Sequence, residues 1–202
     1  MSTQVNTLSF EALLAICQVM DKALDLSSAL TEILRILAER LSMQRATVTL
    51  YEAGTERLAI SGSHGLSAEE KERGVYRLDE GVTGRIFRTG EPYVVPDIDK
   101  EPLFLDKTGS RKIAKGQISF IGVPIVLHGE PMGVLNVDRL FADDVAFDQD
   151  VAFLKVVATL IGQFISLNRK VREREAVLKQ ENVSLKSQIA RERGGPYIVG
   201  RS

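Results

Sequence analysis

The stretch ISFIGVPIVLHGEPMGVLNVDR, residues 118 to 139, decides the fold. It predicts two strands around a tight turn at His128-Gly129-Glu130, yet its apolar residues do not alternate with polar ones. An antiparallel hairpin with one solvent-facing side does alternate, so this pattern indicates that both faces are covered. Helices can cover one face, and a lid can cover the other. A lid over a sheet is a common way to build a small-molecule pocket.

The composition excludes several classes of protein. A chain of 202 residues with 44% hydrophobic residues can form one domain plus an appendage. The formal charge of −1 offers no basic field for nucleic acid or an anionic membrane. We find neither a signal sequence nor an apolar run of about 18 residues, so we expect a cytoplasmic protein without a membrane partner. The single cysteine, Cys17, excludes an internal disulfide, and its apolar helical surroundings predict a buried, inert thiol.

The first half of the chain changes its hydrophobic period from helical to strand-like. Ser9 is suited to cap a helix that continues past Met20, and a second helix is expected from about Ser27 to Leu41. Period-two patterns then predict strands at 46–51 and 58–61. A helical turn at 67–72 and a short strand at 75–78 follow.

The segment from Gly81 to Gly116 has many structure breakers. Gly81 and Gly84 allow a short helix packed closely on the sheet, Gly90 suits the left-handed residue after it, and Pro92 stops it. Residues 93–95 predict a strand. From 92 to 116 the chain has little periodicity but carries apolar residues that favour docking, and long irregular segments of this kind are usually functional or disordered. We interpret 92–116 as the lid, with a positive cluster at Lys107, Arg111, Lys112 and Lys115.

These residues resemble the GAF family of sensory domains over about 9 to 168. The resemblance rests on Gly81-x-x-Gly84, Gly90-x-Pro92, Asp97, the strand with Val123-Pro124, and the strand Gly133-Val-Leu. It implies an α+β fold in which an antiparallel sheet carries helices on one face and a loop-covered pocket on the other. Because proline donates no ladder hydrogen bond, Pro124 predicts a bulge or a strand edge.

A narrower resemblance involves the segments ISFIGVPI, NVDR and FLKVVATLIGQ. These look like the N-terminal sensor of NifA-type activators of nitrogen-fixation genes. In that class an Ile-Val-Gly segment opens an AAA+ ATPase domain that remodels sigma-54 RNA polymerase, and a DNA-binding domain follows. The resemblance therefore implies three parts: a sensory domain at 1–168, a signalling helix at 169–193, and at 194–202 a linker with the start of the ATPase domain. The chain lacks a G-x-x-x-x-G-K-[ST] phosphate loop, so we expect no ATP hydrolysis by this segment.

A long C-terminal helix is expected from Asp148 to Arg193. Its heptad pattern predicts a parallel coiled-coil homodimer, although Glu175 in the seam weakens it, and a single exposed helix is the alternative. Asp143, Asp144 and Asp148 favour the helix start, which we prefer to a divalent-metal site. The predicted dimer contacts are Ile161, Phe164, Asn168, Val171, Leu178, Asn182 and Leu185.

Nothing in the sequence favours an enzyme. His64 and His128 lie in expected loops without a spaced partner, and no G-x-S-x-G motif is present. Some GAF-like proteins reduce free methionine sulfoxide with several cysteines, but Cys17 alone does not support that reaction. We therefore predict a regulatory, non-enzymatic fragment.

The functional prediction is a ligand-sensing module in which a small, anionic metabolite binds between sheet and lid. Lid closure would then alter the dimer helix. Some relatives of the NifA type respond to 2-oxoglutarate, and some respond to an inhibitory regulatory protein. The resemblance therefore implies 2-oxoglutarate as a possible ligand and such a protein as a possible partner. The alternative is a dimerisation or docking module without a ligand. We assign anion contacts to Arg111 and Lys115, apolar walls to Tyr93 and Phe104, and an orienting hydrogen bond to Ser119, while surface charge or ordinary core roles stay open for them.

Overall fold

The computed structural model describes residues 2–23, 25–41, 43–110, 118–140 and 147–193. It divides into two compact units, residues 1–164 and 165–202. The elements, in chain order, are α1 (Ser2–Lys22), α2 (Leu26–Leu41), β1 (Met43–Glu52), β2 (Arg57–His64), α3 (Ala68–Arg73), β3 (Val75–Arg77), α4 (Gly81–Thr89), β4 (Tyr93–Val95), the 3-10 helix η1 (Ile98–Lys100), β5 (Ile118–Leu127), β6 (Glu130–Leu140) and α5 (Phe147–Arg193).

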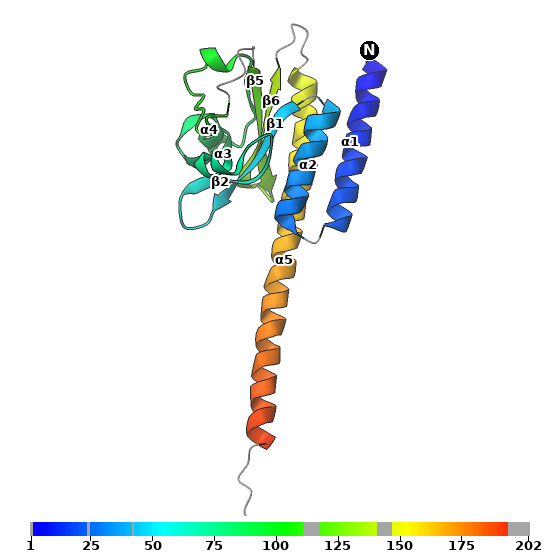
Figure 1. Ribbon diagram of the computed structural model, residues 1–202, viewed down its shortest axis with the longest axis vertical. Helices are drawn as coiled ribbons and strands as arrows, with labels where there is room; N and C mark the ends of the chain where they lie inside the picture. Colours follow the sequence, from blue (N-terminus) through cyan, green and yellow to red (C-terminus); the bar gives the residue numbers. More distant parts are fainter. Residues whose placement is uncertain (1, 24, 42, 111–117, 141–146, 194–202) are drawn as a thin grey trace, which may run out of the picture. The chain divides into compact units, whose positions relative to one another are not determined.

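A six-stranded antiparallel sheet organises the first unit (Figure 1). Its order is β3-β2-β1-β6-β5-β4, so the hairpin β5–β6 predicted from the sequence lies inside the sheet. Six residues of β5, Ile118 to Val123, are buried in succession, which confirms that both faces of the hairpin are covered. Among the described residues, β4 pairs with β5 only at Phe120–Gly122, so Pro124 lies beyond the end of β4, at a local strand edge.

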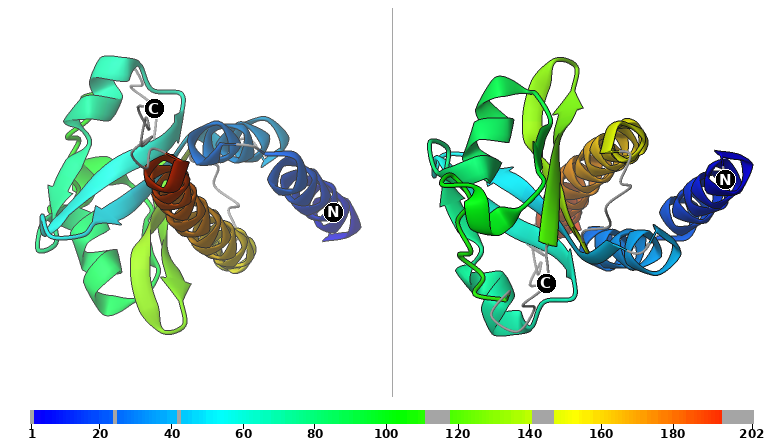
Figure 2. Two further views of the ribbon diagram at one scale, coloured as in Figure 1. Left: turned by 90° about the horizontal axis from the view of Figure 1, so that it is seen from below. Right: turned by 90° about the horizontal axis from the view of Figure 1, so that it is seen from above.

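Helices α2, α1 and the first part of α5 lie on one side of the sheet (Figure 2). α2 packs so closely on β2 that a Cβ at Gly62 would come within 2.7 Å of the Leu30 Cβ. A Cβ at Gly162 of α5 would lie 3.3 Å from the Ile125 side chain of β5. The core on this side is built from fully buried aliphatic residues, including Leu30, Ile33, Leu34, Leu37, Val48, Ile121, Leu135, Leu154 and Val157.

The opposite side of the sheet carries α3, α4 and the irregular chain from 96 to 110 (Figure 2). Ser67 caps α3 through a capping box with Glu70, and Gly90 ends α4 in the left-handed conformation with a φ of 67°. α4 approaches the preceding chain closely at Gly84, where a Cβ would lie 2.7 Å from the Leu78 carbonyl oxygen. The predicted two-sided fold is confirmed, with short helices beside the loop on the lid side.

Two predictions for α1 were wrong. The helix begins at Ser2, so Ser9 lies within it and does not cap it. Cys17 is exposed, because Ala12 and Ile16 form the buried side of α1 and the next residue is turned away by a helical step of about 100°.

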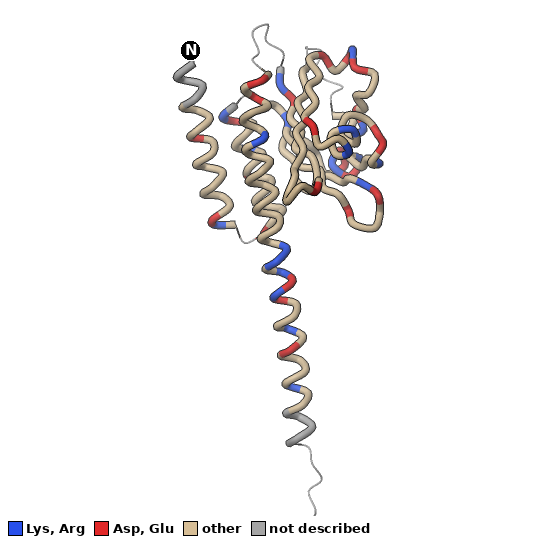
Figure 3. Tube along the Cα trace, turned by 180° about the vertical axis from the view of Figure 1, so that it is seen from behind, with Lys and Arg blue, Asp and Glu red and all other residues tan. Residues whose placement is uncertain are grey.

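In the second unit, α5 continues as a helix from Ile165 to Arg193 with side chains described to Gln188. Lys and Arg are interspersed with Glu along it, and Arg169 pairs with Glu173 one turn later (Figure 3). Within 147–188, α5 contains an 18-residue window of mean hydropathy 1.6, long and apolar enough to cross a membrane, of which 39% is buried. Core helices also have this composition, so it is weak support for a span.

Candidate ligand pocket

A ladder of polar residues runs along the lid side of the two central strands. Arg45 of β1 pairs with Asp138 of β6, and Thr47 pairs with Asn136 two residues further along. Because side chains alternate across a strand, these residues project to the same face of the sheet. Asn136 and Asp138 are buried, with exposed fractions of 7% and 3%. Buried polar side chains on a sheet face mark a candidate binding site.

This ladder forms the floor of a cavity of about 30 Å³, enough for one or two water molecules. The walls come from β2, β3, α4, β5 and the loop 101–110. Apolar residues dominate the walls, and no cysteine or histidine is among the described residues that line the cavity. The lining residues are Arg45, Ala46, Thr47, Ile60, Leu66, Tyr76, Val82, Thr83, Phe104, Leu105, Thr108, Phe120, Asn136 and Asp138.

Two polar groups in the lining are incompletely bonded. Arg45 donates from Nη2 to the Ser110 carbonyl oxygen at 2.7 Å, but its buried Nη1 lies 3.7 Å from an Asp138 oxygen, too far for a hydrogen bond. The buried Asn136 Oδ1 has no hydrogen-bond partner among the described residues. Gly122 on β5 leaves the space that this amide occupies, since a Cβ there would lie 3.0 Å from Oδ1.

The loop 101–110, which is part of the predicted lid 92–116, is fastened to the domain by backbone carbonyl groups. The Leu103 carbonyl accepts a hydrogen bond from the Val82 amide at 3.1 Å. The Thr108 carbonyl accepts two bonds from the Arg73 guanidinium, at 3.0 Å from Nε and 2.6 Å from Nη2. Charge-assisted bonds of this kind hold a loop of irregular sequence in one conformation.

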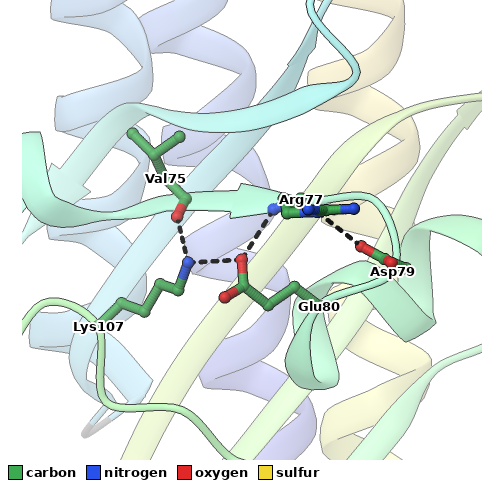
Figure 4. A network of polar contacts seen from close by, with 5 residues as sticks. All are labelled: Val75, Arg77, Asp79, Glu80 and Lys107. Carbon is green, nitrogen blue, oxygen red and sulfur yellow. Dashed lines mark hydrogen bonds and ion pairs between the residues drawn. The ribbon is translucent and has the colours of Figure 1, made fainter.

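Lys107 provides a further fastening (Figure 4). Its Nζ donates to the Val75 carbonyl at 3.0 Å and to the Glu80 carboxylate, which also accepts from the Arg77 amide at 3.0 Å. The Lys107 ammonium, then the Arg77 amide, lower the pKa of Glu80. The predicted positive cluster is thus engaged at Lys107 in holding the lid, while Arg111, Lys112 and Lys115 lie outside the described residues.

The structure distributes the other predicted site residues over different places. Phe104 lines the cavity and meets Phe120 edge-on, with ring centroids 5.2 Å apart. Tyr93 does not line it: its hydroxyl donates to Glu101 at 3.1 Å, the Arg85 guanidinium lies 4.7 Å from its ring centroid, and burial is the main cause that raises its pKa.

Ser119 lies on the helix side of β5. Its partner in the register is Arg139, whose carbonyl accepts a bond from the Ser119 hydroxyl at 3.3 Å, while the neighbouring pair Phe120 and Asp138 faces the cavity. Strand alternation therefore places Ser119 away from this cavity, so the cavity gives no support to its predicted contact with a ligand.

Sequence reasoning missed the residues that matter most here, Arg45, Asn136 and Asp138. The available signal was the polar-apolar alternation of Asn136-Val137-Asp138 within the segment NVDR. Arg45 precedes the predicted strand 46–51 and gave no signal. No group of three or more possible metal ligands occurs among the described residues, and Asp143 and Asp144 lie outside them.

The predicted dimer residues also divide into two sets. Ile161 and Phe164 belong to the first unit and are buried there, with exposed fractions of 0% and 6%. Val171, Leu178 and Leu185, seven residues apart, are exposed by 47%, 58% and 56%. Asn168 is half-buried, and Asn182 is exposed and donates to the Leu178 carbonyl at 3.2 Å.

Comparison with known proteins defines the class. Residues 25–165 match the model of the GAF domain family, and the chain belongs to that family. The fold agrees with the crystal structure of the GAF domain of A. Aeolicus nlh2 in an inactive state, at a TM-score of 0.74 and 23% identity over 81% of this chain and 98% of the other. A free methionine-R-sulfoxide reductase from Neisseria meningitidis shares the fold at a TM-score of 0.64 and 20% identity, over 81% of this chain and 93% of the other.

The relatives in sequence are more specific. The chain is 37% identical to the Nif-specific regulatory protein of Azospirillum brasilense over 94% of its length, and 40% identical to that of Herbaspirillum seropedicae over 90%. It is 35% identical to the nitrogen fixation protein VnfA of Azotobacter vinelandii over 92% of its length. The chain covers 31%, 33% and 36% of these relatives, or about a third of each.

Proposed function

We propose that this chain is the regulatory, ligand-sensing and dimerising domain of a cytoplasmic, NifA-like sigma-54-dependent activator of nitrogen-fixation genes. In the whole protein it would control a downstream AAA+ ATPase, and sigma-54 RNA polymerase and DNA would be contacted by other domains. The proposal is supported by relatives named as Nif-specific regulatory proteins that align with 90% or more of the chain. It is also supported by the GAF family match.

The observation that carries the sensing role is the position of two consecutive residues on β6. Asp138 faces the cavity, and Arg139 faces the other side of the sheet, where its guanidinium pairs with Asp150 in the first turn of α5. A ligand that shifts the Asp138 end of the strand therefore also shifts the partner of α5. If the ligand binds more tightly when α5 is in one of two positions, that difference in binding free energy couples the pocket to α5.

The dimerising role is supported by the exposed apolar residues of α5. With Ile161 and Phe164 occupied in the core, the proposed seam consists of Val171, Leu178 and Leu185, with Asn168 and Asn182 at a positions. Exposed apolar residues at heptad spacing are stabilised by a second helix. A homodimer would let the two ATPase domains respond together.

Sedimentation of the chain with two matched variants tests this role. Leu178→Lys places a charge in the proposed seam, and we expect it to weaken dimerisation by about tenfold or more. Val183→Lys adds the same charge to an equally exposed residue, 62% against 58%, outside the seam. Its association should match that of the wild type. A monomeric wild-type chain, or equal effects of both variants, would contradict the dimer.

Hydrogen exchange of α5 tests the sensing role. A metabolite that fills the cavity, 2-oxoglutarate included, should change exchange at residues 147–164, and Asp150→Asn should reduce that change because it breaks the link to Arg139. The alternative is a module that docks an inhibitory regulatory protein without a ligand, and the small cavity of about 30 Å³ favours it. Unchanged exchange with every metabolite, together with binding of such a protein, would establish that alternative.

A further inference from the structure

The cavity floor carries two groups with opposite requirements. The buried Arg45 Nη1 offers N–H donors without an acceptor at hydrogen-bond distance, and the buried Asn136 Oδ1 offers an acceptor without a donor among the described residues. Leaving either group unbonded when buried costs about 1 to 3 kcal/mol. A molecule that satisfies both would need an acceptor and a donor at neighbouring positions.

The spacing of the two groups sets the scale of that molecule. Asn136 faces Thr47 across the strands, and Arg45 is the next residue of β1 on the same face. Diagonal neighbours on a sheet have backbones about 7 to 8 Å apart, and their polar side-chain atoms can come closer than that. One small molecule that carries a donor group and an acceptor group can reach both. The hydroxyls of Thr47 and Thr83, which also line the cavity, can donate or accept.

Charge limits the class further. The described lining contains one cationic side chain, Arg45, and one anionic side chain, Asp138, so the formal charge of the floor is zero. A dicarboxylate would bring two negative charges next to the buried Asp138, whereas a zwitterion keeps the cavity neutral. Phe104, Phe120 and Tyr76 give the cavity aromatic walls, against which an apolar side chain of the ligand could pack.

We infer that the cavity binds a free α-amino acid, with its ammonium group on Asn136 Oδ1 and its carboxylate on Arg45 Nη1. The inference rests on the proposed sensing function and names the ligand class for the same pocket. The cavity of about 30 Å³ is smaller than any amino acid, so the lid must move outward to admit one. The bonds from Arg73 to Thr108 and from Arg45 to Ser110 hold the lid in its present position, so they would have to lengthen or break in the bound state.

Thermal unfolding of the chain with single amino acids at about 10 mM tests the inference, because a ligand bound by the folded state raises Tm. The matched control is the α-keto acid with the same side chain, which keeps the carboxylate but lacks the ammonium donor. We expect the amino acid to bind about tenfold or more tightly than its keto acid, as loss of a charge-assisted hydrogen bond requires.

Two variants locate the site and one controls for stability. Asn136→Leu should weaken binding about tenfold or more, and so should Arg45→Lys, which keeps the charge opposite Asp138 and serves if the first variant does not fold. Thr49→Val removes another unpartnered buried group on the same strand but outside the lining, so binding should not change. The inference fails if no amino acid binds, if the keto acid or 2-oxoglutarate binds as tightly, or if Asn136→Leu leaves binding unchanged. If 2-oxoglutarate binds tightly and alters hydrogen exchange in α5, the sensing function stands but the assignment of an amino acid as the ligand is wrong.

Discussion

Thr49 provides a sharp test of how the sheet is packed. It lies on β1 between Ile60 of β2 and Val134 of β6, is fully buried, and its Oγ1 has no hydrogen-bond partner among the described residues. A buried hydroxyl without a partner costs about 1 to 3 kcal/mol. Valine has the same shape and a higher preference for strands. We therefore expect Thr49→Val to stabilise the domain, unlike most core substitutions.

The expected gain in the free energy of unfolding is about 1 kcal/mol, which is the low end of the desolvation cost. We choose the low end because the substitution also changes the free energy of the unfolded chain. For a domain of this size, that gain corresponds to a Tm increase of about 2 to 4 °C. Urea unfolding followed by circular dichroism measures the change, and the slope against denaturant should remain constant.

Val48→Thr is the reciprocal control. Val48 is the preceding residue, is equally buried and faces the helices on the other side of the sheet. The same exchange of methyl for hydroxyl should there lower the free energy of unfolding by about 1 to 3 kcal/mol. If Thr49→Val lowers stability instead, the hydroxyl has a partner and the assignment of its surroundings is wrong.

Two other expectations follow from the lid side of the domain. Because Lys107 lowers the pKa of Glu80 in the folded state, the pair stabilises the domain above the unfolded carboxyl pKa of about 4.3, and this contribution is lost as pH falls through the lower folded pKa. In Glu80→Gln, the free energy of unfolding should therefore fall less steeply with decreasing pH than in the wild type. Equal pH profiles of the two proteins would show that the pair does not stabilise the domain. Gly84→Ala places a methyl 2.7 Å from the Leu78 carbonyl, and we expect a loss of about 1 to 3 kcal/mol in thermal unfolding. Gly54→Ala meets nothing within 4 Å, and its cost should come only from the φ of 82° there.

The elements with strong local signals could be predicted from the sequence. α4 is an example, because Gly90 and Pro92 define its end and the helix stops at Thr89 with Gly90 left-handed. The lid was also predictable as an irregular, partly apolar segment, and Phe104 within it lines the cavity. Tyr93 and Ser119 lie outside the cavity lining, Ser119 because strand alternation turns it to the helix side, and composition alone does not say which face of a strand a residue occupies.

The sequence by itself determined the family, the two-sided burial of β5 and β6, and a helical C-terminal segment with apolar residues at heptad spacing. The family is indicated by the resemblance of its motifs, whereas the burial and the helix follow from local periodicity and turn chemistry, which act between residues close in the chain. Only the tertiary structure decided the polar floor of the pocket, because Arg45 and Asp138 are brought together by the pairing of β1 with β6. The tertiary structure also decided that Ile161 and Phe164 are buried in the core, since their burial depends on which side of α5 packs against the sheet. Such long-range contacts are set by the register and packing of distant segments, which no local pattern records.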